Sequence, residues 1–64
     1  MKKQIMKVEM YGRTLVVKEV PGTDYPFRVY DVICSKKTVH LDSFESFQEA
    51  WTFVESELWG GYYR

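Results

Sequence analysis

Residues 46–58 read SFQEAWTFVESEL, and this stretch carries the strongest secondary-structure signal in the chain. Ser46 and Glu49 have the spacing of a capping box, in which the serine accepts from the Glu49 amide and the carboxylate returns to Ser46. Gly60 and Gly61 follow as a C-terminal cap. The stretch therefore predicts one amphipathic helix, whose apolar residues recur at three- and four-residue spacing at Phe47, Ala50, Trp51, Val54 and Leu58.

Before this helix, apolar and polar residues alternate with a period of two, which is typical of half-buried β-strands. Gly12 and the segment Pro21–Asp24 mark turns, because glycine accepts a positive φ and proline fixes a bend. The third strand is apolar on both faces. In the second strand the alternation does not decide which residues point inward. Strands are expected at residues 4–10, 14–20, 27–34 and 38–41.

These elements predict a single α+β domain spanning residues 1–64. The expected fold is a four-stranded antiparallel sheet, made of two hairpins, followed by one C-terminal helix packed on it. In the core, Trp51 and Val54 are expected to be fully buried, with Phe47, Ala50 and Leu58 beside them. Val39 and Leu41 are expected to face inward from the last strand.

The size of the domain limits its stability. A chain of 64 residues buries only about 60% of the surface that its unfolded form exposes. Cys34 is the only cysteine and His40 the only histidine, so neither an intramolecular disulfide nor a four-ligand zinc site can form. We therefore expect no metal and no cofactor, and an aromatic-rich core, self-association, or both.

The compartment is predicted from the same residues. A free cysteine suits a reducing compartment. The sequence has no apolar run of the length that a signal peptide or a membrane helix needs. A cytoplasmic location is expected, and short cysteine-poor chains of this type suggest an origin in a phage or prophage.

The charges divide into two unlike halves although the formal net charge is zero. Residues 1–37 carry eight basic side chains and four acidic ones, a net charge of +4. Residues 38–64 carry one basic side chain and five acidic ones, a net charge of −4. If the first part is sheet and the last part helix, the molecule has a basic side and an acidic side.

Catalysis is not expected, and no catalytic residue is assigned. Cys34 and His40 fall on neighbouring predicted strands, and a cysteine beside a histidine can form an activated thiolate. A sheet of this size offers no deep pocket and no group to orient the pair. We interpret both residues as structural.

The order of strand, short basic turn, strand and helix in residues 25–58 resembles the arm-binding domain of tyrosine integrases from phages and conjugative elements. The similarity includes the spacing of Phe47, Ala50 and Trp51 at the helix start. It implies a sheet face that enters the major groove of DNA. The chain differs by an extra N-terminal hairpin, no glycine in the Ser35–Lys37 turn and no net charge. The corresponding DNA-contacting residues would be Arg28, Tyr30, Lys36, Lys37 and His40.

The function indicated first is protein binding rather than DNA binding. On a helical wheel, Phe53 and Trp59 fall on either side of the apolar stripe, outside an ordinary core face. Aromatic side chains rimmed by acids are typical interface anchors. We expect Phe53, Trp59 and Tyr30 to form an interface of a non-catalytic interaction or regulatory module. Its partner would be a second copy, as a homodimer, or another protein, with DNA as the alternative partner and no membrane.

Overall fold

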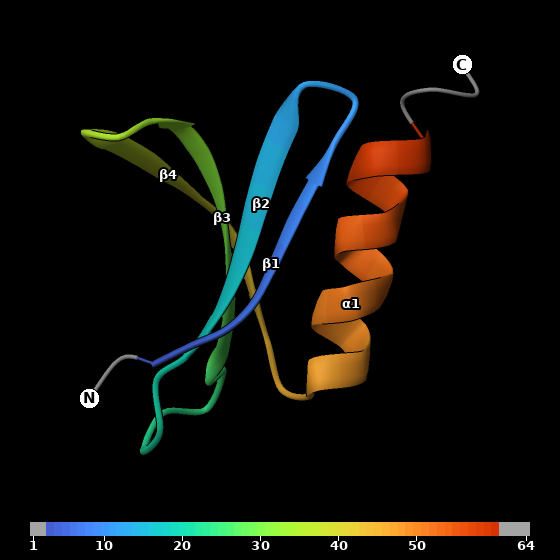
Figure 1. Ribbon diagram of the computed structural model, residues 1–64. Coiled ribbons are helices and arrows are strands. Elements are labelled where there is room, and N and C mark those ends of the chain that lie inside the picture. Colours follow the sequence, from blue (N-terminus) through green and yellow to red (C-terminus); the bar gives the residue numbers. More distant parts are fainter. Residues whose placement is uncertain (1–2, 61–64) are drawn as a thin grey trace.

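The computed structural model describes residues 3–60 and confirms the predicted α+β fold (Figure 1). A four-stranded antiparallel sheet is followed by one C-terminal helix that packs on it. The helix continues directly into a π-helical segment, η1. The elements are β1 (Lys3–Met10), β2 (Arg13–Glu19), β3 (Phe27–Cys34), β4 (Lys37–Phe44), α1 (Phe47–Glu55) and η1 (Ser56–Gly60).

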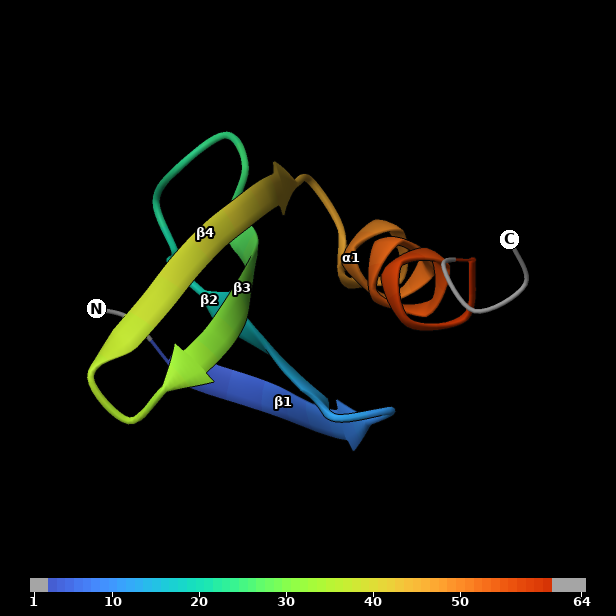
Figure 2. The ribbon, with the colours of Figure 1, turned by 90° about the horizontal axis from the view of Figure 1, so that it is seen from above.

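The strands pair in chain order, β1-β2-β3-β4, so each neighbouring pair is a hairpin. Both residues of the β1–β2 turn have positive φ, 55° at Tyr11 and 75° at Gly12. Such a turn matches the right-handed twist of the two strands, and glycine is favoured there because it accepts positive φ without strain. The sheet is strongly twisted, and the β3–β4 turn points away from the helix in both views (Figures 1 and 2).

The core is a thin layer between one face of the sheet and the helix. Leu15 and Val17 of β2 are fully buried, which settles the inner face of that strand. Met6, Val8 and Met10 of β1 pack against this layer while staying half-buried. The buried core residues are Leu15, Val17, Val29, Ala50, Val54 and Leu58.

The helix is rotated relative to the prediction. Ala50 and Val54 are fully buried, as expected for Val54, but Trp51 is only half-buried and lies on one flank of the buried face. The prediction of full burial for Trp51 was therefore wrong. Phe47, in the first turn of the helix, is 40% exposed, and its ring makes a T-shaped contact with the Phe27 ring, with centroids 6.2 Å apart.

The last strand is longer than predicted and only partly covered. β4 spans Lys37–Phe44, so its first half belongs to the hairpin end that points away from the helix (Figure 2). Val39 pairs with Asp31 and so faces the helix side of the sheet, as predicted, but it is 38% exposed, because the helix does not cover this end of the hairpin. Leu41 packs against the core, next to an irregularity in the β3–β4 register, where Val29 pairs with Asp42 and Tyr30 with His40.

The helix begins as the capping box predicts. The Glu49 amide donates to Ser46 Oγ at 3.2 Å, and Ser46 Oγ donates to Glu49 Oε1 at 3.1 Å. The C-terminal end differs from an α-helix, because residues Ser56–Gly60 form a π-helical turn. The predicted cap at Gly61 lies outside the described residues.

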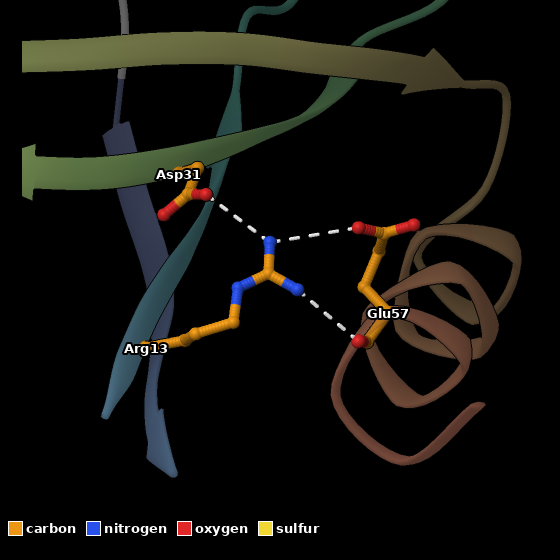
Figure 3. A network of polar contacts seen from close by, with 3 residues as sticks. All are labelled: Arg13, Asp31 and Glu57. Atoms are coloured by element: carbon orange, nitrogen blue, oxygen red, sulfur yellow. Dashed lines mark hydrogen bonds and ion pairs between the residues drawn. The ribbon is translucent and has the colours of Figure 1, made fainter. Parts of the chain in front are cut away.

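Arg13 joins this final turn to the sheet (Figure 3). Its Nη2 donates to Asp31 Oδ2 on β3 at 3.1 Å and lies 3.5 Å from Glu57 Oε1. Its Nη1 donates to the backbone carbonyl of Glu57 at 3.2 Å. Carbonyls in the last turn of a helix have no partner within the helix, so the guanidinium satisfies one of them and connects β2, β3 and η1.

We expect Leu15→Ala to destabilise the domain strongly, because Leu15 is fully buried at the centre of the core layer. Such a truncation costs about 2–5 kcal/mol, which is comparable to the total stability of about 3–5 kcal/mol expected for a domain of this size. Urea unfolding followed by circular dichroism measures the loss. Val39→Ala is the control, since that side chain is exposed and its loss should change the midpoint little. Equal losses in the two variants would contradict the described core.

The Arg13 network predicts unequal effects for its two carboxylates. Asp31→Asn should lower the free energy of unfolding by about 1 kcal/mol, since the Asp31 side chain is 19% exposed and directly hydrogen-bonded. Glu57→Gln keeps the backbone carbonyl contact and removes only the longer, more exposed ion pair, so its cost should stay below about 0.5 kcal/mol. Urea titrations of both variants make the comparison. A larger effect of Glu57→Gln would show that the ion pair, rather than the carbonyl contact, holds η1.

Candidate functional site

The face of the sheet opposite the helix carries two rows of side chains that the strand register aligns. Residues paired across antiparallel strands point to the same face of a sheet. The first row is Gln4, Lys18, Arg28 and Ser43, and the second is Lys7, Val16, Tyr30 and His40. We call these eight residues the open face, because α1 packs on the other side, against Leu15, Val17 and Val29.

Aromatic and polar contacts link the middle of the open face. The Tyr30 and His40 rings lie 5.3 Å apart and tilted, and Lys18 Nζ lies 5.0 Å from the centre of the Tyr30 ring. His40 Nε2 and Ser43 Oγ share a hydrogen bond of 2.9 Å. A lysine over an aromatic ring is a favourable cation–π geometry. These contacts give β2, β3 and β4 one connected surface of mixed aromatic and basic character.

The open face also has a packed centre. Val16 is only 3% exposed although it points away from the helix, with Lys7 and Tyr30 beside it on the neighbouring strands. Arg28 Nε is buried and makes no hydrogen bond with any described residue. The Arg28 side chain is therefore positioned by packing rather than by an acceptor, which leaves a donor unsatisfied at some cost in free energy.

The charge of the open face is positive. Lys7, Lys18 and Arg28 belong to it, and Glu9, which pairs with Thr14 beside the second row, adds one carboxylate to the same side of the sheet. Within residues 3–60 the ion pairs are those of Arg13, on the opposite face. The three cations of the open face consequently have no carboxylate partner in the described part of the chain, and their charge is available to an anion.

Three of the five DNA-contacting residues implied by the integrase resemblance meet on this surface. Arg28, Tyr30 and His40 lie on the open face, whereas Lys36 is in the exposed β3–β4 turn and Lys37 begins β4. The sequence reading missed Lys7, Lys18, Gln4, Val16 and Ser43. The signal that would have found them is the register of β1, β2 and β4 against β3, because alternation alone leaves the inner face of β2 ambiguous.

Cys34 and His40 do not meet. Cys34 is exposed and pairs with Lys37 near the hairpin turn, while His40 pairs with Tyr30 further along the strand. Among residues 3–60 no cluster of three or more metal-binding side chains occurs. The described part of the chain also encloses no pocket.

The expectation that Phe53 and Trp59 lie outside the core was wrong. Both side chains are half-buried and pack against the core. Phe53 stacks at a tilt on Phe44, with centroids 5.3 Å apart. Trp59 donates from Nε1 to the sulfur of Met10 at 2.9 Å. Of the three predicted interface residues, only Tyr30 lies on a face that the helix leaves open.

The π-helical turn explains the position of Trp59. The helical wheel assumes α-helical rotation throughout, which places residue 59 far from residue 54. In an i→i+5 turn, residues five apart lie nearly above one another, so Trp59 comes round toward the buried side of Val54. On that side the Trp59 indole contacts Met10 of β1.

Two aliphatic side chains are exposed near the turn of the β3–β4 hairpin. Ile33 is 57% exposed and Val39 38%. The register shifts between Val32 and Cys34, so Ile33 is an extra residue in β3 at an irregularity of the kind that bends a strand. Lys36 and Lys37 flank it and are exposed. We call Ile33, Lys36, Lys37 and Val39 the hairpin tip.

The chain matches no protein-family model, no curated protein and no solved structure. None of the helices in residues 3–60 has the length and apolar character needed to cross a membrane.

The packing of Trp59 is checked by its fluorescence in a Trp51→Phe variant, which leaves one tryptophan in the chain. We expect emission at shorter wavelength than in the urea-unfolded protein and weaker quenching by acrylamide, because Trp59 is half-buried against Met10. Adding Met10→Ala should move both properties toward the unfolded values. The same emission in the folded and the unfolded protein would show that Trp59 is exposed to solvent and could again be considered an interface residue.

Proposed function

We propose that this protein is a non-catalytic binding module that contacts duplex DNA with the open face of its sheet. The observation that carries the proposal is the pair of aligned rows across the strands. They bring Lys7, Lys18 and Arg28 to the same face as Tyr30 and His40, and none of these three cations forms an ion pair with a carboxylate among residues 3–60. Basic groups clustered on one face are the electrostatic footprint of a nucleic-acid-binding protein.

The role proposed for each of these side chains follows from its chemistry. Lys7 and Lys18 would contact phosphates, which gives affinity and orientation. Arg28 would read base edges, since its forked guanidinium can donate twice to guanine in the major groove. Tyr30 and His40 would keep the surface in register through their contact with each other. The resemblance to integrase arm-binding domains supports the same use of a sheet face, and with it an intracellular role encoded by a phage or mobile element.

The acidic side chains of the helix disfavour contact between DNA and the helix side of the domain. Glu49 in the first turn of α1 and Glu45 just before it are exposed carboxylates, which would repel a phosphate backbone. The basic open face lies on the other side of the sheet from α1. A molecule with zero net charge can therefore approach DNA productively from one side only.

The strength of binding expected from these charges is modest and sensitive to salt. Each neutralised phosphate contributes about −0.9 to the slope of log affinity against log salt. Three contacts give a slope of about −2.7, or about a 40-fold loss of affinity between about 50 and about 200 mM salt. Specific binding would need base contacts in addition to this electrostatic attraction.

The proposal predicts that Lys18→Gln weakens binding to duplex DNA and flattens the salt slope by about 0.9. Fluorescence anisotropy with a labelled duplex measures both properties. Lys3→Gln is the matched control, because it removes the same charge from the other face of the sheet. Lys3 is in register with Glu19 and Glu19 with Phe27, which packs against the core on the helix side. Absence of binding by the wild type at about 50 mM salt, or equal effects of the two variants, would refute a DNA-binding open face.

A second function, binding to another protein, is favoured by a different surface. We infer that the hairpin tip, rather than Phe53 and Trp59, would supply the contact. Ile33 and Val39 leave apolar area in water, and apolar residues bordered by charges are a frequent composition of interaction sites. This surface is separate from the open face along β3, so both functions can belong to one chain.

The tip is tested by Ile33→Asp in a capture experiment with immobilised protein and a host lysate. We expect a captured protein to be lost in this variant and kept in Ile5→Asp, which changes a residue of similar chemistry that is 37% exposed on β1. Circular dichroism of each variant verifies that the fold is retained. Unchanged capture by Ile33→Asp would remove the hairpin tip from the interaction.

A further inference from the structure

The topology gives the molecule two unlike ends. In a meander, successive turns alternate between the two ends of the sheet, so the β3–β4 turn lies opposite the β2–β3 loop and the link from β4 to α1. Figure 1 shows the β3–β4 turn and the start of α1 at opposite ends of the molecule. Each end carries exposed apolar residues, and the charges around them have opposite signs.

The hairpin tip is the basic end. Lys36 and Lys37 are exposed beside Ile33 and Val39. The nearest carboxylate by register is Asp31, which pairs with Val39 and is already bound to Arg13. The positive charge of the tip is therefore not compensated by a neighbour within the described chain.

The start of the helix is the acidic end. Tyr25 is 55% exposed and Phe47 40%, and the carboxylates of Asp24, Glu45 and Glu49 are exposed around them. Lys3 and Glu19 are cross-strand neighbours at this end, and Lys18 and Arg28 lie one position further along β2 and β3, on the open face. We call Asp24, Tyr25, Glu45, Phe47 and Glu49 the acidic end.

We propose that the chain binds a second copy of itself, with the hairpin tip of each copy against the acidic end of the other. This inference rests on the second function above and names its partner. Apolar residues of the tip would meet Tyr25 and Phe47, while the lysines face carboxylates. Like ends repel and unlike ends attract, and two such contacts made reciprocally close a two-fold dimer.

The experiment exchanges the charges of the two ends in separate variants. Lys36→Glu with Lys37→Glu makes both ends acidic, and Asp24→Lys with Glu45→Lys makes both ends basic. Neither variant disturbs the capping box, which uses Ser46 and Glu49. Sedimentation equilibrium should show that the wild type dimerises, that each variant alone dimerises at least about tenfold more weakly, and that their equimolar mixture recovers a dimer. In the mixed pair, each tip again meets an end of opposite charge.

Three outcomes would overturn the inference. The first is a wild type that stays monomeric at high micromolar concentration, and the second is a mixture that associates no better than its components. The third is growth of the wild type into species larger than a dimer, which indicates head-to-tail contacts that do not close. A monomeric wild type that still loses capture through Ile33→Asp would overturn only the choice of partner, so the two failures are distinguishable. Circular dichroism of every variant confirms that the fold is kept.

Discussion

The burial of one helix against one face of a four-stranded sheet is the constraint on which the rest of this structure depends. The contact layer consists of three sheet residues and three helix residues. Ala50 is fully buried in it and has a side chain small enough to let the helix backbone come close to the sheet. A single helix cannot cover both faces, so the opposite face must be polar or find a partner. The Arg13 network then fixes the far end of the helix, where η1 departs from α-helical geometry.

This layering also separates the charges. Acidic residues concentrate on and before the helix, whereas Lys7, Lys18 and Arg28 share the opposite face of the sheet. In the sequence these cations are spread over 22 positions, from 7 to 28, and only the antiparallel register makes them neighbours. A net charge of zero thus conceals two surfaces of opposite sign, and long-range attraction to an anion depends on which surface faces it.

The sequence predicted the elements well because their signals are local. The capping box at Ser46 and the positive-φ turn at Gly12 are each decided by a few adjacent residues, and both occur where expected. The errors arose where geometry depends on tertiary contacts. A π-helical turn moves Trp59 onto Met10, and the departure of the β3–β4 hairpin from the helix exposes Val39. Periodicity assumes a constant rotation per residue along a helix and a sheet that the helix covers along its whole length. It could therefore predict neither the position of Trp59 nor the exposure of Val39.

The candidate sites were predictable to a smaller extent, for the same reason. Arg28, Tyr30 and His40 could be placed together from alternation within one hairpin, but Lys18 requires the pairing of β2 with β3. The two proposed surfaces occupy successive parts of β3, with Arg28 and Tyr30 in its first half and Ile33 near its end. A dimer closed by the hairpin tip of each copy on the acidic end of the other would therefore carry two open faces on one particle. Two linked weak contacts raise apparent affinity through effective concentration, so self-association would compensate for the modest DNA affinity that three cations can give.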